Sequence, residues 1–461
     1  MNGNDVETRC DEATPGEAAA YRRNLLFLAL VEAGWGLGTA FVSPGAVLPM
    51  LAASMGASMA VVGLLPGLSS IAMSLPQLVA AHRTAGMRRQ LGFVARWHVW
   101  PTFGFLAVAG VVAAGGHGPG AVALLYGALA LWYLGIGYVI PVWVAFVGKL
   151  SGPSRRAHVF GVLSTMGLLL GSCGAWLAGR LLVALPAPWN YAAGAVVAFA
   201  ALNLANLAWL GVDEEAAPAA EEPSEEETRP EGLVAYVRHQ LRTVAGDVAF
   251  VQFLLAQQFL LCHQVLGSFY LLWAKGRFGA SAGDVMDWSG LTMVSQAVAS
   301  VLYSWAGDRV GARTTLLGSQ LLLAAAMGWT LMARQASDLT VVSVLLGLFY
   351  GTYFNAKTAM VLEMAEGRDT AAYLAVSNLF TTPAAVLLPA AAGWAMDRWG
   401  FPPVLIVALG GTALGSLFFV GSLCTADLPR SLFAGLVGRL RTALAYAGGG
   451  VRRARVALGL W

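Results

Sequence analysis

The sequence predicts an all-α membrane protein with twelve transmembrane helices in two six-helix bundles. Hydrophobic residues make up 57% of the 461 positions, charged residues only 11%, and the mean hydropathy is +0.66. A soluble domain carries about 25% charged residues, so a large soluble core does not explain this composition. Apolar runs of about 18 residues or more recur along the chain, and each is long enough to cross a bilayer. The 55 glycines suit such a bundle, because small residues allow helix backbones to approach closely.

Six apolar runs precede a polar break, and six follow it. The first six spans are expected near residues 24–50, 59–79, 91–113, 121–147, 159–185 and 191–210. The last six are expected near residues 249–273, 285–306, 315–332, 341–365, 371–396 and 403–423. This repeated layout indicates an internal duplication.

The composition divides the chain into five parts. These are an N-terminal tail (1–20), a first bundle (21–210), an acidic linker with a surface helix (211–247), a second bundle (248–424) and a basic tail (425–461). Residues 211–232 hold nine acidic residues, three prolines and no aromatic residue, which is typical of a solvated linker. The tail after Pro429 holds six arginines and no acid. We expect it either to lie on the anionic inner leaflet or only to reinforce topology.

The positions of the arginines predict the orientation of the chain. Basic residues gather in the turns after spans two, four, eight and ten: Arg83, Arg88, Arg89, Arg155, Arg156, Arg309, Arg313 and Arg368. The opposite turns are poorer, with Lys275, Arg277, Arg334 and Arg398 as the exceptions. Because cytoplasmic loops carry the excess of positive charge, we expect both termini and the linker in the cytoplasm of a bacterium, and the spans in its inner membrane.

One short stretch, residues 304–313 (SWAGDRVGAR), stands between spans eight and nine. Asp308 is expected to cap or pair with a neighbouring helix end, next to a turn at Gly311. Arg309 and Arg313 are expected to reach carbonyl groups at helix C-termini, where cations are favoured. Our hypothesis is that these contacts act as a conformational switch. The alternative is a charge cluster that only sets topology.

Twelve spans in two halves with a D-R-x-G-x-R stretch after span eight resemble the major facilitator superfamily. Ser304 stands where the family signature has a glycine, and Ala312 replaces one basic residue. The equivalent turn of the first half has His82 in place of the aspartate. A second echo follows span eleven on the predicted outer face and contains Gly393, Asp397, Arg398 and Gly400. The resemblance covers about residues 21–424. It implies secondary transport by alternating access, with spans one, four, seven and ten around a central cavity.

The candidate residues for substrate binding or coupling are polar or aromatic side chains of those four spans. They are Glu32, Trp35, Tyr133, Tyr138, Gln257, His263, Gln264, Tyr350, Tyr353 and Lys357. Such side chains are costly in a membrane unless they are paired or face water. Glu32 is a candidate for carrying a coupling proton or pairing with a cationic substrate, and the alternative is an ion pair with Lys357. His263 is a candidate proton relay or a structural hydrogen-bonding group. The aromatic rings either stack on an amphipathic ligand or simply pack.

The sequence predicts no enzymatic activity, cofactor, metal site or nucleic-acid partner. It has no GxxxxGK[ST], HExxH or GxSxG pattern, and its four cysteines are scattered without metal-ligand spacing. We expect a monomer that lies in the bilayer and binds a small organic molecule as its substrate. Protons are the candidate coupling ions. Two alternatives stay open: efflux of amphipathic compounds, and a non-transporting sensor or assembly anchor. Span five lacks the Gly-Pro element of the family's drug antiporters, and span four lacks their buried arginine, which disfavours proton-coupled drug efflux.

Overall fold

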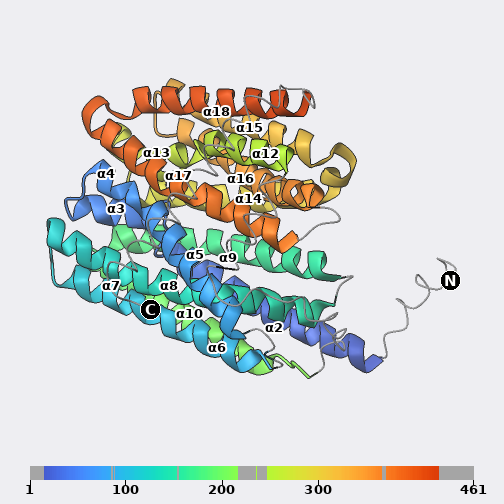
Figure 1. Cartoon of the computed structure of the whole chain (residues 1–461). Coiled ribbons are helices and arrows are strands. Elements are labelled where there is room, and N and C mark those ends of the chain that lie inside the picture. The colour runs from blue at the N-terminus through green and yellow to red at the C-terminus, as the bar shows by residue number, and fades with distance from the viewer. Residues whose placement is uncertain are drawn as a thin grey trace, which may run out of the picture.

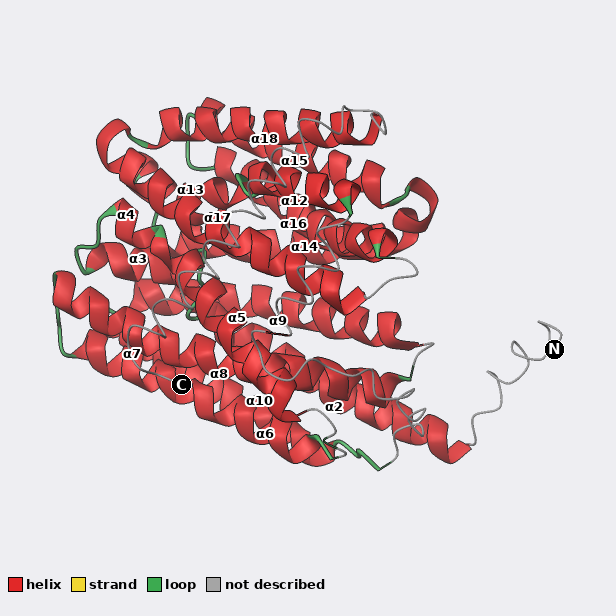
Figure 2. Ribbon diagram, viewed as in Figure 1, coloured by secondary structure: helices red, strands yellow, loops and turns green. Residues whose placement is uncertain are grey.

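The computed structural model describes residues 15–84, 87, 89–152, 155–215, 235, 247–365 and 370–424. In that part of the chain Figure 2 shows helices joined by loops, with no strand. The all-α prediction is therefore confirmed. The expected surface helix before residue 247, the greater part of the acidic linker and the basic tail lie outside the described residues.

The first half contains the helices that were expected as spans one to six. Their bounds are α2 (Pro15–Ala40), α3 (Val47–Ser54), α4 (Met59–Val62), α5 (Leu64–Thr84), α6 (Leu91–Val99), η1 (Trp100–Thr102), α7 (Phe103–Ala113), α8 (Pro119–Ser151), α9 (Arg156–Ala184), α10 (Trp189–Asn206) and η3 (Leu207–Gly211).

The second half contains the helices that were expected as spans seven to twelve. Their bounds are α12 (Val248–Leu260), α13 (His263–Phe278), α14 (Ala282–Val310), α15 (Ala312–Met332), α16 (Asp338–Met364), α17 (Thr370–Trp399) and α18 (Phe401–Cys424). Figure 1 shows the yellow-to-red helices of this half stacked on the blue-to-green helices of the first half.

Nine segments of the described chain are long and apolar enough to cross a membrane. Helices also occupy the three remaining expected spans, as α2, as α6–η1–α7 and as α14. The helical positions therefore agree with the predicted layout of six spans followed by six spans.

Three expected spans differ from the structure in their detail. Span one was expected to reach Met50, but α2 ends at Ala40 and a turn leads into α3. Pro44 lies in this turn, and a proline disfavours helical backbone in the residue before it. Pro101 coincides with the 3₁₀ segment η1, which interrupts span three because proline cannot donate its helix hydrogen bond. Span seven is broken between α12 and α13, at Leu261 and Cys262.

The main contact between the halves joins α9 to α14, and the second joins α4 and α5 to α17. α9 and α14 run antiparallel, since Gly171 packs on Met293 while Gly179 packs on Met286. Gly67 packs on Val386 in the second contact. Glycines allow these backbones to approach closely, as is common between membrane helices.

Candidate functional site

Trp35 takes part in a polar and aromatic network inside the first half. Its indole N–H donates to Asn206 Oδ1 at 2.9 Å, and its ring stacks on Trp132 with centroids 5.4 Å apart. Asn206 also accepts from the indole N–H of Trp209 at 3.3 Å and donates to the carbonyl of His98 at 3.1 Å. The polar group of Trp35 is therefore used in helix packing between α2 and α10.

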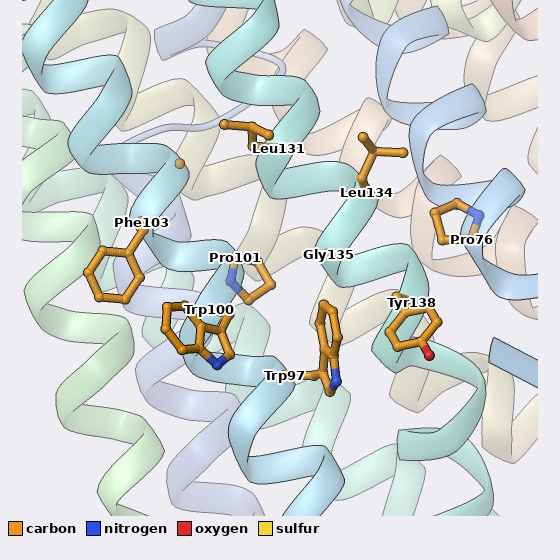
Figure 3. A pocket seen from close by; sticks show the side chains of 10 residues that line it. Pro76, Trp97, Trp100, Pro101, Phe103, Leu131, Leu134, Gly135 and Tyr138 are labelled. Carbon is orange, nitrogen blue, oxygen red and sulfur yellow. The ribbon is translucent and has the colours of Figure 1, made fainter. Parts of the chain in front are cut away.

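The two predicted tyrosines of α8 have different surroundings. Tyr133 is 6% exposed and belongs to the hydrophobic core. Tyr138 lines a groove of about 480 Å³, where its ring centroid lies 4.5 Å from that of Trp97 (Figure 3). The rest of the lining is Pro76, Trp100, Pro101, Phe103, Gly104, Leu131, Leu134 and Gly135. All of these residues belong to α5, α6, η1, α7 and α8, so the groove lies in the first half alone.

In the second half, His263 is enclosed by aromatic rings of α16. Its ring centroid lies 5.3 Å from that of Phe349, 6.0 Å from that of Tyr350 and 5.1 Å from that of Tyr353. Its Nδ1 lies 2.9 Å from the carbonyl oxygen of Leu260, and the residue is 5% exposed. The structure therefore brings three predicted residues together, in a packed cluster between α13 and α16.

The two predicted glutamines of the second half have incompletely satisfied amide groups. Gln257 is 1% exposed and its Oε1 accepts from the Ser377 hydroxyl at 3.3 Å. Its buried Nε2 and the buried Oε1 of Gln264 have no hydrogen-bond partner among the described residues. A buried polar atom without a partner costs about 1–3 kcal/mol, which makes both amides candidates for contact with a ligand or water.

Glu32 and Lys357 do not form the ion pair that was one reading of the sequence. Ion pairs of the described residues join Arg23, Arg89 and Lys149 to acidic residues at positions 213–215, and none joins Glu32 to Lys357. Both side chains are half-buried. The structure therefore keeps two opposite charges apart within membrane spans.

One end of the molecule is closed by contacts between the halves. The carboxylate of Asp397 accepts from the backbone N–H of Met59 at 2.9 Å and from that of Ala60 at 3.1 Å. A Cβ added at Gly393 would clash with the carbonyl oxygen of Met59. A Cβ added at Gly63 would clash with the carbonyl oxygen of Pro389. We call this set of contacts the α4–α17 closure.

Several glycines of α9 and α14 contact the other helix directly. On α9 the glycine contacts to α14 run from Gly171 to Gly179, in its C-terminal half. On α14 they run from Gly283 to Met293, in its N-terminal half. Nothing lies within 4 Å of a Cβ added at Gly161, nearer the start of α9. The described glycine contacts between α9 and α14 thus lie in the half of these helices nearer the α4–α17 closure.

The predicted switch stretch lies at the opposite end of α14. α14 ends at Val310 and α15 begins at Ala312, with Gly311 between them at φ 83°. This left-handed backbone favours glycine, which explains the turn residue of the stretch. The side chain of Asp308 lies outside the described part of the chain, while Arg309 and Arg313 are exposed.

The first residues of the acidic linker tie together the same end of the first half. Arg23 donates to Asp213 at 2.6 Å, Arg89 to Glu215 at 2.8 Å and Lys149 to Glu214 at 3.0 Å. We call Asp213, Glu214 and Glu215 the acidic clamp. It joins the N-terminal part of α2, the start of α6 and the end of α8.

Glu214 also caps α6. Its carboxylate accepts from the backbone N–H groups of Gln90 at 2.8 Å and Leu91 at 3.0 Å. Burial by itself raises the pKa of Glu214, but these two hydrogen bonds and the Lys149 ammonium outweigh it and hold that pKa below its ordinary value.

Sequence reasoning missed two features of the site region. Asn206 and His98 were not predicted to join Trp35, because residues 171 and 63 positions away carry no periodic signal of the contact. Asp397 was noticed only as an echo of the signature. A better signal was available, since an acid at the end of a span is suited to capping a neighbouring helix N-terminus.

Comparison with known proteins supports the assignment of this fold. Residues 248–434 match the family model described as Major Facilitator Superfamily. The solved nucleoside transporter NupG has a TM-score of 0.63 at 8% identity, covering 88% of this chain and 99% of that one. A POT family transporter in complex with 5-aminolevulinic acid has a TM-score of 0.64 at 13% identity, covering 86% and 95%. No curated protein matches the sequence significantly.

The second half of the chain thus matches the major facilitator superfamily, and the described chain as a whole has the fold of solved transporters. The family match and the nine candidate spans of the described residues indicate a multi-pass membrane protein. A second POT family structure, in complex with a thioalcohol conjugated peptide, has a TM-score of 0.66 at 12% identity and covers 88% of this chain. At such identities these likenesses establish the fold and carry no assignment of cargo.

Proposed function

We propose that this protein is a secondary transporter of the major facilitator superfamily, which moves a small organic molecule across the membrane by alternating access. The carrying observation is the set of contacts that joins its halves at one end. The α4–α17 closure seals one end, and the described glycine contacts of α9 and α14 lie nearer that end. Two bundles joined in this way can rock about a midplane site.

The orientation of the chain in the membrane indicates which side of the membrane the closed end faces. The basic turns and the acidic clamp lie at the end opposite the α4–α17 closure. Under the positive-inside rule that end faces the cytoplasm. The described conformation would then be closed on the outer side of a bacterial inner-membrane protein with both termini in the cytoplasm.

Glu32 is the better candidate for coupling to protons. His263 is enclosed by aromatic rings and bonded to its own helix backbone, which favours a structural role. The side chain of Glu32 has no hydrogen bond or ion pair with another described residue, which leaves its carboxyl group able to take up and release a proton. The alternative function, efflux of amphipathic compounds, is favoured by the aromatic groove around Tyr138.

Reconstitution into proteoliposomes tests the proposed function. We would measure uptake of radiolabelled uridine and dialanine, as representatives of the nucleoside and peptide classes of the solved neighbours, with and without an imposed pH gradient. We expect the uptake of one of these two classes to exceed the uptake by protein-free vesicles. Gly393→Trp should reduce this uptake, because its bulky side chain would hold the two sides of the α4–α17 closure apart.

Two further results bear on the alternatives. Accumulation of an amphipathic dye in inverted vesicles would favour efflux. A chain that moves none of these compounds, and whose halves stay closed at α4–α17 in every condition, would overturn the proposed function and favour the sensor or anchor. Deleting residues 430–461 distinguishes these last cases, because a transporter should keep flux and an anchor should lose its partner.

A further inference from the structure

Two charged residues stand out within the apolar spans of the four inner helices. The spans expected at 24–50, 121–147, 249–273 and 341–365 contain Glu32, Lys357 and Glu363 as their charged side chains. Glu363 is exposed, one residue from the end of α16, where it can reach the membrane surface. Glu32 and Lys357 lie farther inside, in α2 and α16.

Neither inner charge has a hydrogen bond or an ion pair with any described residue. A charge within a membrane is costly unless it is paired or meets water. Each of these charges bears the free-energy cost of leaving water. Because the two charges are separate, their mutual attraction does not offset any of this cost. Such an arrangement is expected where a third group, carried by the cargo, supplies the missing partners.

Contacts along the helices place Glu32 at a definite depth. A Cβ at Gly167 would lie 3.5 Å from the carbonyl oxygen of Glu32, so Gly167 of α9 is level with it. Gly171, four residues later, packs on Met293 of α14. Because α9 and α14 are antiparallel, Glu32 is level with about residue 297 of α14.

The same reasoning places Lys357 closer to the basic end. The Asn355 amide donates to the hydroxyl of Ser300 at 3.3 Å, and α16 runs parallel to α14 here, since Gly351 packs on Gln296. Lys357, two residues later, is level with about residue 302. At 1.5 Å per residue the two charges are offset by about 8 Å along the helix axes. Both lie beyond Met293, on the side away from the α4–α17 closure.

We propose that the cargo is a small zwitterion whose ammonium group is held by Glu32 and whose carboxylate is held by Lys357. This inference rests on the proposed transport function and names its substrate class. The offset favours a cargo whose ammonium and carboxylate are several bonds apart, such as a dipeptide, a tripeptide or an ω-amino acid with several methylene groups.

One polar group of α13 and one of α16 would suit the amide groups of such a cargo. Gln264 of α13 offers a buried Oε1 without a described partner, which can accept from an amide N–H. The hydroxyl of Tyr350 lies against Gly267, and a Cβ at this glycine would clash with it. An amide carbonyl of the cargo would find this hydroxyl as a donor.

Binding of matched ligands to the full-length protein in detergent tests the zwitterion proposal. The probes are glycylglycine, triglycine and ε-aminocaproate, each with its N-acetylated and its C-amidated form. Binding is read as a concentration-dependent rise of the unfolding temperature, by mass action. At least one zwitterion should bind about 10- to 100-fold more tightly than both of its blocked forms, as expected for hydrogen bonds to charged groups.

Variants assign each end of the ligand to one residue. Glu32→Gln should abolish the preference over the N-acetylated form and keep the preference over the amide. Lys357→Met should do the opposite. Glu363→Gln and Lys275→Met, which change charges near helix ends, should leave both preferences unchanged. The proposal is overturned if the blocked forms bind as well as the zwitterions, if no zwitterion of the series binds, or if both variants keep both preferences.

A double-mutant cycle of Glu32 and Lys357, measured without ligand, tests whether the two charges are unpaired. Unpaired charges predict that Glu32→Gln and Lys357→Met each leave the unfolding temperature unchanged or raise it, and that their effects add. Strongly non-additive losses would reveal a direct ion pair and would also overturn the proposal. Flux measurements separate the two proposals: zwitterion binding without uptake contradicts transport alone, whereas uptake without charge preference contradicts the zwitterion alone.

Discussion

Asp397 at the end of α17 accepts hydrogen bonds from the backbone N–H of Met59, at the start of α4, although the two residues are 338 positions apart. Helix N-termini leave N–H groups without partners and carry a partial positive charge. The carboxylate of Asp397 accepts hydrogen bonds from two of these N–H groups and lies next to the partial positive charge, across the boundary between the halves. In the proposed cycle this bond forms when this end closes and breaks when it opens.

Asp397→Asn is expected to shift the protein away from the state closed at α4. Asparagine keeps the size of the side chain and loses its charge, so about 0.5–1 kcal/mol of interaction with the helix N-terminus should be lost. The population ratio should change about two- to fivefold. Spin labels at Ser54 and Pro402, in a background without native cysteines, report the separation of the halves at this end. Asp287→Asn, an exposed acid in the first turns of α14, is the control, and equal distance distributions for both variants would contradict this role of Asp397.

Gly393→Ala is expected to open the same end more strongly. A Cβ at this position would clash with the carbonyl oxygen of Met59, and backbone atoms cannot turn aside as a side chain can. Overpacking costs about 1–3 kcal/mol, so the closed population should fall further than in Asp397→Asn. The same labels measure it. Gly410→Ala, where nothing lies within 4 Å of the added Cβ, should leave the distances as they are, and a wild-type distribution for Gly393→Ala would rule out tight closure.

Much of this fold follows from the sequence because apolar runs report directly on helices that cross a membrane. The turn at Gly311 was equally visible, since its glycine stands between two runs. The breaks at Pro44 and Pro101 were readable from proline chemistry, yet the long apolar runs around them outweighed it. Local composition thus determines where helices begin and end with useful accuracy.

The site could be predicted only as a set of helices. The sequence placed Trp35 beside Glu32 on one face, but the indole is bound by Asn206 of α10, which no periodicity links to α2. The partner of Asp397 is a backbone group of Met59, which leaves no trace in residue type. The offset between Glu32 and Lys357 depends on how three helices pack, so it needed coordinates.

Asn206→Leu is expected to destabilise the protein without changing its ligand preference. The change removes three hydrogen bonds, to Trp35, Trp209 and His98. At about 0.6 kcal/mol for each bond within a membrane, the loss is about 2 kcal/mol. Trp35→Phe removes one of these bonds and should lose about a third as much. Thermal unfolding in detergent measures both, and a changed ligand preference in Trp35→Phe would place the indole in the binding site.

Glu214 gives the acidic clamp a pH dependence that can be measured. Its pKa in the folded protein lies below the ordinary value of 4.5, so folding favours the ionised form. The resulting stability is therefore fully present well above pH 4.5. It is lost progressively as the pH falls below 4.5 and through the folded pKa.

Thermal unfolding of wild type and Glu214→Gln between pH 7 and pH 4 tests this dependence. Glu214→Gln should unfold at a lower temperature at pH 7, because glutamine has one acceptor for the two N–H groups of α6 and no charge for Lys149. The gap between the two proteins should narrow as the pH falls, since wild type loses the contribution that the variant already lacks. Glu215→Gln, whose ion pair with Arg89 is exposed, should show a smaller gap at pH 7. A gap for Glu214→Gln that stays constant down to pH 4 would show that its charge does not stabilise the clamp.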